Sequence, residues 1–186
     1  MTTQVPLALL PDGVFTADAA GRAKFAAGFV NPTIAGAGQL VQNVGTMNAA
    51  VATGTTVIPR DDTIPQNTEG TQFLTQAITP TSATNILEIE AVLMLSSSVT
   101  SDVIAALFQD SGANAIAVAS QYATTSLGVM CLTLKHRMVA GTTSATTFNV
   151  RAGPMTAGTV TFNGASGGRY YGGVIASSIT IKEFKV

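Results

Sequence analysis

Strict alternation of apolar and polar side chains is the feature that most constrains the fold of this chain. Between Asn85 and Leu95 every second residue is apolar, and Glu88 and Glu90 lie between the apolar positions. Successive side chains of a β-strand point to opposite faces, so this pattern predicts a strand with one face in a core and one face in water. The apolar positions are Leu87, Ile89, Ala91, Leu93 and Leu95.

Similar short segments follow one another from residue 55 to the C-terminus. Phe148 and Val150 alternate with polar residues, as do Ile179 and Ile181, and clusters of Gly, Pro, Asp and Asn separate the segments. Many short strands without a long helical pattern predict an all-β fold, an antiparallel β-sandwich of jelly-roll type. The expected strands are Thr55–Ile58, Thr71–Ile78, Asn85–Leu95, Val103–Gln109, Asn114–Tyr122, Leu127–Val139, Thr146–Ala152, Val160–Asn163 and Ser177–Phe184.

Two of these segments, residues 103–108 and 127–134, are apolar on both faces or nearly so. A strand buried on both faces needs a second layer of protein, and we expect another copy of the chain to supply it. Charged residues make up only 10% of the chain, whereas about 25% is usual, which also predicts a surface partly hidden in an assembly. Because no heptad repeat is present, the β domain itself is expected to form a homotrimer.

Residues 1–54 are rich in Ala and Gly and have too few large apolar side chains for a core of their own. Asp18 is suited to cap one short helix with Phe25 and Phe29 on one face. We expect an arm that docks on another protein or on a neighbouring subunit through Phe15, Phe25 and Phe29; a loosely ordered tail is the alternative. A chain truncated at the end of this arm is expected to fold.

Catalytic chemistry finds little support in the sequence. The only histidine, His136, and the only cysteine, Cys131, are five residues apart, so a regular strand places their side chains on opposite faces. No phosphate-binding glycine motif occurs. We therefore expect no catalytic residue, no cofactor and no enzymatic activity.

Two loops carry residue types that bind ligands. Asp61, Asp62 and Glu69 are oxygen ligands suited to Ca²⁺, but their spacing fits no EF-hand loop, and capping of turn amides is favoured over a metal site. In the loop at residues 164–173, Arg169, Tyr170 and Tyr171 supply planar groups that bind sugars and proteins. The competing interpretation of this loop is a turn whose tyrosines cover a sheet edge or a trimer seam.

Charge and hydropathy exclude two classes of partner. The net charge is −1 and the nine Lys and Arg residues are dispersed, which is unlike a nucleic-acid-binding surface. Apolar stretches are far shorter than the ~20 residues that span a bilayer, and the start MTTQVPLALLPDG lacks the basic region of a signal peptide.

The segment IPRDDTIPQNTEGTQFLTQAITPTSATNILEIE at residues 58–90 resembles the C-terminal domains of phage tail-fibre and related virion appendage proteins, as do ALFQDSGANAIA, AGTTSATTFNVRAG and SSITIKEF. The resemblance covers roughly residues 57–186 and implies a trimeric jelly-roll-like module on the surface of a phage particle, made in the host cytoplasm. It implies a structural tail-fibre or appendage protein that adheres to a glycan or protein of the host surface. A capsid decoration protein or head fibre is the alternative, and in both cases residues 1–54 would attach to the tail or capsid. A polysaccharide depolymerase is disfavoured, because no β-helix repeat is present.

Overall fold

The computed structural model describes the backbone of Phe15–Ala17 and Ala23–Phe25 and all of residues 37–186. The chain divides into two compact units, residues 1–36 and 37–186. In the first unit, β1 (Phe15–Ala17) and β2 (Ala23–Phe25) are antiparallel, with Phe15 opposite Phe25. The helix expected across this region is therefore wrong at Ala23–Phe25, where the backbone pairs with a strand. Asp18 and Phe29 lie outside the described residues.

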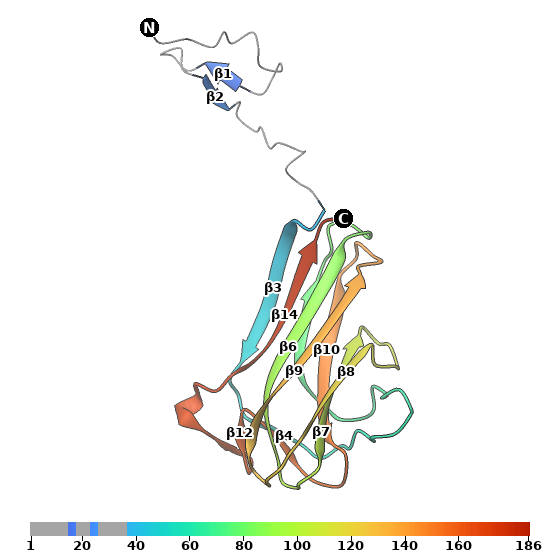
Figure 1. Cartoon of the computed structure of the whole chain (residues 1–186), viewed down its shortest axis with the longest axis vertical. Helices are drawn as coiled ribbons and strands as arrows, with labels where there is room; N and C mark the ends of the chain where they lie inside the picture. The colour runs from blue at the N-terminus through green and yellow to red at the C-terminus, as the bar shows by residue number, and fades with distance from the viewer. Residues whose placement is uncertain (1–14, 18–22, 26–36) are drawn as a thin grey trace. The chain divides into compact units, whose positions relative to one another are not determined.

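The second unit is a sandwich of two antiparallel sheets, which confirms the predicted fold class (Figure 1). The small sheet has the order β5-β10-β7-β8, and the large sheet has the order β3-β14-β6-β11-β4 with β9 also paired to β6. In the described part of the chain no helix is long and apolar enough to cross a membrane. The strands of the small sheet are β5 (Thr71–Ile78), β10 (Thr146–Pro154), β7 (Asp102–Gln109) and β8 (Ala117–Tyr122). Those of the large sheet are β3 (Leu40–Asn48), β14 (Ser177–Phe184), β6 (Ile86–Ser97), β11 (Val160–Phe162), β4 (Ala52–Gly54) and β9 (Val129–Val139).

The core lies between the two sheets and follows the predicted alternation. All five predicted apolar positions of β6 are buried, as are Ile179 and Ile181 on the neighbouring β14. Phe73 of the small sheet stacks on Phe162 of the large sheet, with ring centroids 5.0 Å apart. Full burial of a large apolar side chain stabilises a fold by roughly 1.5–3 kcal/mol, so these inward rows hold the sheets together.

Strand β7 is buried on both faces, as predicted, but its second layer comes from the same chain. Ile104, Ala106 and Phe108 pack against Ile58, which lies in the segment between β4 and β5. The expectation that another copy covers residues 103–108 is therefore wrong. Arg151 holds the end of the covering segment by donating hydrogen bonds to the carbonyl oxygens of residues 69 and 70.

The predicted boundary near residue 55 lies too late in the chain, because β3 and β4 belong to the sandwich. Strand β3 pairs with β14 along its length, and β4 pairs with β11. The expected strand at Thr55–Ile58 is absent, and the segment crosses over β7 instead. Two short strands were not predicted, β12 (Gly164–Ala165) and β13 (Gly168–Arg169), nor was the 3₁₀ turn η2 (Tyr171–Gly173).

Glu183 is a buried carboxylate on β14 that joins three parts of the fold. Its oxygens accept hydrogen bonds from the Gln42 amide on β3 at 2.5 Å, from the Asn85 amide at 2.6 Å, and from the Thr81 hydroxyl and backbone amide at 2.8 Å. Burial raises the pKa of Glu183, but the hydrogen bonds from Gln42, Asn85 and Thr81 outweigh burial and lower the pKa to about 2. The carboxylate thus fixes the loop between β5 and β6 against the end of the large sheet.

The position of the unit boundary predicts the outcome of two truncations. A chain that begins at Ala37 keeps every strand of the sandwich and should unfold at the same temperature as the full chain. A chain that begins at Thr55 loses β3, β4 and the Gln42 hydrogen bond, and its midpoint should fall by roughly 6 °C or more, since ~3 kcal/mol moves the midpoint by about 2–4 °C per kcal/mol at this size. Thermal unfolding followed by circular dichroism measures both, and equal midpoints would place the boundary at residue 55 after all.

Substitution Glu183→Gln should destabilise the fold by about 1–3 kcal/mol at neutral pH, because hydrogen bonds to an ionised acceptor are stronger than those to a neutral one. The folded-state pKa lies below the ordinary value of 4.5, so the carboxylate contributes stability above about pH 4.5 and loses it as the pH falls toward 2. Urea unfolding at several pH values tests this. The difference between the two proteins should shrink across that window, and a difference that stays constant would contradict the assigned role.

Candidate functional site

The face of the large sheet that points away from the core carries both charged side chains and partly exposed apolar side chains. On β6 it carries Glu88, Glu90, Val92 and Met94 in alternate positions, so its character changes from acidic to apolar along one strand. We call this surface the outer face and divide it into two halves. The charged half consists of Glu88, Glu90, Lys135, Arg137, Thr180 and Lys182. The neutral half consists of Met47, Val92, Met94, Cys131, Thr133 and Ser178.

In the charged half, three neighbouring strands form columns of alternating sign. Carboxylates on β6 lie between cations on β9 and a cation on β14. Lys135 pairs with Glu90 at 2.9 Å and Arg137 with Glu88 at 3.3 Å. Exposed pairs of this kind contribute at most about 1 kcal/mol each. These residues line a hollow of about 450 Å³ on the outer face.

Lys182 lies directly opposite Glu88 in the strand register but forms no ion pair among the described residues. Its side chain is exposed. The charged half therefore holds three cations and two carboxylates, and the cation on β14 is the one without a partner within this part of the chain.

The neutral half exposes apolar surface to solvent. Met47 is 77% exposed, while Val92 and Met94 are half-buried. Cys131 lies opposite Met94 and is exposed, so the expectation that its strand is covered is not met within one chain. His136 lies on the other face of β9, where burial lowers its pKa. The two side chains thus occupy opposite faces of β9.

The loop that holds Arg169, Tyr170 and Tyr171 is exposed. Tyr171 is 75% exposed and Val174 is 84% exposed, and the two tyrosine rings meet edge to face with centroids 6.2 Å apart. Tyr171 has φ of +49°, a left-handed conformation that costs a non-glycine residue about 1 kcal/mol or more. Neither tyrosine belongs to the buried core clusters, and both interpretations of this loop, ligand binding and a trimer seam, stay predictions.

A buried hydrogen-bond network fixes the base of this loop beside the neutral half. Asn163 donates to the carbonyl oxygens of Asn48 and Ala50 at the end of β3, at 2.7 and 3.0 Å. Its side-chain oxygen accepts from the Ser177 hydroxyl at 2.7 Å. The Ser96 hydroxyl of β6 donates to the Gly164 carbonyl at 2.8 Å. The loop is therefore anchored to the end of the large sheet.

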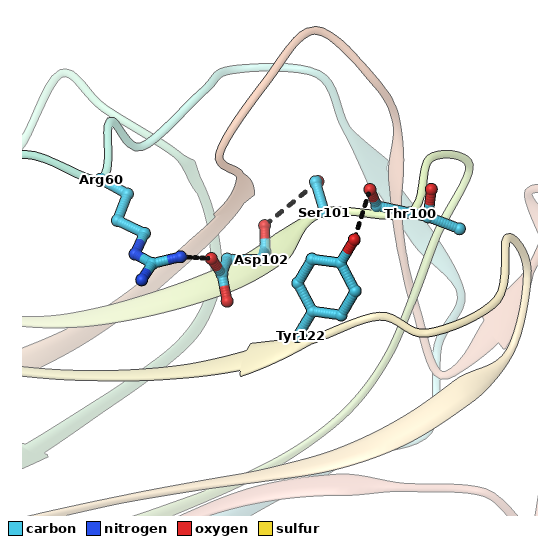
Figure 2. Close-up of polar contacts among 5 residues, drawn as sticks. All are labelled: Arg60, Thr100, Ser101, Asp102 and Tyr122. Atoms are coloured by element: carbon cyan, nitrogen blue, oxygen red, sulfur yellow. Dashed lines mark hydrogen bonds and ion pairs between the residues drawn. The ribbon is translucent and has the colours of Figure 1, made fainter.

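A second polar cluster lies at the start of β7 (Figure 2). The buried carboxylate of Asp102 accepts from Arg60 at 2.6 Å, and the Tyr122 hydroxyl donates to the Thr100 carbonyl at 3.5 Å. The Ser101 hydroxyl is directed to the backbone carbonyl of Asp102 at 3.3 Å and not to its carboxylate. Asp102 is therefore not placed to activate this serine, and its ion pair fixes the segment that covers β7.

Two of the three acidic residues considered for metal binding, Asp61 and Glu69, cap turns. Asp61 accepts from the backbone amide and hydroxyl of Thr63, and the hydroxyl bond, followed by the amide bond, lowers the pKa of Asp61. Glu69 accepts from the backbone amide of Gln66 at 2.9 Å. Within residues 37–186 and the described strands before them, no three His, Cys, Asp or Glu residues form a group suited to a metal ion.

Comparison with known proteins gives a family for the sandwich. The sequence model of the Pgp3 C-terminal domain, a Chlamydia virulence protein family, matches residues 40–186. The chain belongs to this family. The match begins at the first strand of the sandwich, so it supports the boundary seen in the structure.

This membership corrects the assignment to phage tail fibres and virion appendages, together with the alternative of a capsid decoration protein. The same correction applies to three expectations that depended on the phage assignment. They are a position on a virion, adhesion to a host through a phage particle, and attachment of residues 1–54 to a tail or capsid. The role assigned to Phe15, Phe25 and Phe29 as virion contacts depended on that assignment.

Two solved structures show a distant likeness to the chain. Eiger TNF from S. frugiperda is 9% identical, with a TM-score of 0.46 over 77% of this chain and 92% of that chain. The EclA C-terminal domain, a sugar-binding protein, is 17% identical, with a TM-score of 0.31 over 73% of this chain and 76% of that chain. No curated protein matches the sequence.

The candidate residues of the outer face that the sequence analysis missed are Met47, Met94 and Lys182. The sequence did contain a signal for the neutral half: the outward positions of β6 change from Glu90 to the apolar residues Val92 and Met94. Lys182 was placed only on the polar side of its strand, and its neighbours could be named only from the strand register.

The conformation of Tyr171 predicts the effect of replacing it. Tyr171→Gly should leave the free energy of unfolding unchanged or raise it by up to about 1 kcal/mol, because glycine adopts a positive φ without strain and Tyr171 belongs to neither buried core cluster. Urea unfolding of the isolated chain at low concentration measures this. A loss of more than 1 kcal/mol would show that the ring packs against the sandwich.

Proposed function

We propose that this chain is a non-catalytic module that associates with copies of itself through the outer face. The observation that carries the proposal is the neutral half, where Met47, Val92, Met94 and Cys131 are left partly or fully in solvent by a single chain. Apolar surface of this kind gains roughly 25 cal/mol for each Å² that is removed from water. A second copy is favoured as the cover, since the face carries carboxylates and cations together and so complements itself.

The charge columns favour a cyclic homotrimer over a symmetric dimer. A two-fold axis through the β6 column would place the Glu88 and Glu90 carboxylates of one copy against those of the other, which is repulsive. If the copies instead meet through different parts of the outer face, the cations of one copy lie against the carboxylates of the next copy. Such a heterologous contact closes only as a ring, and the smallest ring has three copies.

The proposal that the module has no catalytic site rests on what the acidic side chains do. Glu88 and Glu90 pair with cations, Glu183 and Asp102 hold buried networks, and Asp61 caps a turn. Each of these carboxylates is used to stabilise the fold. His136 lies on the opposite face of β9 from Cys131, so neither can activate the other.

Recognition of a partner by the Arg169–Tyr171 loop is a second proposed function. The observation in its favour is the adjacent exposure of Tyr170, Tyr171 and Val174 on a base that is held by buried hydrogen bonds. An anchored loop loses little conformational entropy when it binds, which favours recognition. Replacement of Arg169 and Tyr171 by serine should then abolish binding of the partner while leaving the mass of the assembly unchanged.

Light scattering in non-denaturing buffer tests the first proposal. We expect a mass close to three times that of the 18.9 kDa chain, and a monodisperse monomer would rule the proposal out.

Alkylation of Cys131 then locates the interface. The thiol should react at least about tenfold more slowly in the assembly than after dilution to single chains, because the neighbouring copy covers it. A matched control carries Cys131→Ser and Tyr122→Cys, which moves the single thiol to an exposed position on the small sheet; its rate should be independent of concentration. Rapid labelling of Cys131 in an assembled protein would show that the copies meet through another surface.

A further inference from the structure

Lys182, the cation of the charged half without an ion pair among the described residues, suggests how neighbouring copies contact one another. This inference rests on the proposed self-association. Lys182 is the β14 member of the row that also holds Glu88 and Arg137. Arg137 already pairs with Glu88 from the β9 side, at 3.3 Å through one carboxylate oxygen, Oε1. Lys182 has no carboxylate within 4.0 Å among the described residues.

The carboxylates of β6 have capacity for a second partner. Glu90 pairs through Oε2 and Glu88 through Oε1, so each has one oxygen outside its ion pair with β9. Both side chains are 45% exposed. A carboxylate accepts up to about four hydrogen bonds, so a second ammonium group can bind without displacing the first.

We infer that Lys182 of one copy forms an ion pair with Glu88 or Glu90 of a neighbouring copy. The arrangement matches a heterologous contact, in which the β14 side of one outer face meets the β6 column of the next. The apolar half would supply most of the free energy of association, and this ion pair would fix the register between copies, as charge pairs commonly do at interfaces. A small inorganic anion in the hollow is the competing occupant of the space beside Lys182.

Zero-length cross-linking with a water-soluble carbodiimide tests the inference on the full chain. The reagent joins an ammonium group and a carboxylate that are in contact by an amide bond, with loss of water. We expect covalent dimers and trimers on a denaturing gel. Lys182 lies opposite Glu88 within each chain as well, so the assembly is mixed from ¹⁵N-labelled and unlabelled chains, and mass spectrometry should show Lys182 of one isotope joined to Glu88 or Glu90 of the other. The pair of Lys135 and Glu90 is an internal control, because its link lies within one chain, removes one water and leaves the protein at the position of a monomer on the gel.

Lys182→Arg is the matched variant. Arginine keeps the positive charge and the ion pair, but its guanidinium does not form the amide, so the mass by light scattering should stay the same while the covalent oligomers disappear. Lys182→Glu should raise the protein concentration at half-assembly by at least about tenfold, because like charges would face each other. Circular dichroism checks that both variants are folded, and the cross-linking of the unaltered chain does not depend on either.

Each outcome decides a different point. An assembly of the expected mass whose covalent oligomers join other lysines would overturn the Lys182 pair and leave the proposed self-association standing. A monomeric mass would overturn both. If inorganic sulfate at millimolar concentration abolishes the cross-link without changing the mass, Lys182 binds the anion and not the neighbouring carboxylate, which also overturns the inference.

Discussion

The rest of the fold depends on the pairing of β6 along both of its edges. Strand β9 occupies one edge from residue 86 to residue 96, so β14 and β11 share the other edge. The inward side chains of β6 therefore meet the whole core, while its outward side chains have strands on both sides and cannot be covered by a neighbouring strand of the same sheet. Whatever covers the outward face must come from above the sheet. At one end the β12–β13 hairpin does this through the bond from Ser96 to Gly164. Toward the middle of the sheet, Val92 and Met94 stay partly in solvent.

Period-two alternation was sufficient to predict the strands that carry the core, because there one face is apolar and the other is not. Strands β5 and β14 have the predicted bounds, since Thr71–Ile78 and Ser177–Phe184 are flanked by turn-forming residues. Strand β3 was missed because the apolar residues of its segment, LVQNVGTMN, do not alternate strictly with polar ones, and because the strand lies at the edge of the sheet, where only Val44 packs on the core. Its pairing with β14 involves residues more than a hundred positions away, and no local pattern contains that information. The boundary error at residue 55 has the same cause.

The burial of β7 shows why a correct pattern led to a wrong partner. Residues 103–108 are apolar on both faces, and both faces are buried. The sequence could not show whether the second layer is another copy or the chain itself, because the covering residue Ile58 was assigned to a strand of its own. The family error is of another kind. Short phrases rich in Thr, Ala and Gly recur in many β-proteins with little charge, so they support a fold class but do not identify a family. The model of the Pgp3 C-terminal domain matches residues 40–186 as a whole, so it is stronger evidence for a family than a few short phrases.

In the proposed assembly, the two halves of the outer face have different roles. An apolar surface alone is not directional, so copies that met only through Met47, Val92 and Met94 could slide or turn relative to one another. Charges alone would be weak, because exposed ion pairs gain little in water and are screened by salt. On the outer face the two lie along the same strands, with the charged rows at one end of β6 and the apolar rows in its middle. Burying the apolar rows brings the charged rows into a drier environment, where an unpaired Lys182 would be costly and a paired one favourable. In the proposed assembly, the neutral half would therefore supply the affinity between copies, and the charged half would restrict them to the arrangement in which each cation meets a carboxylate.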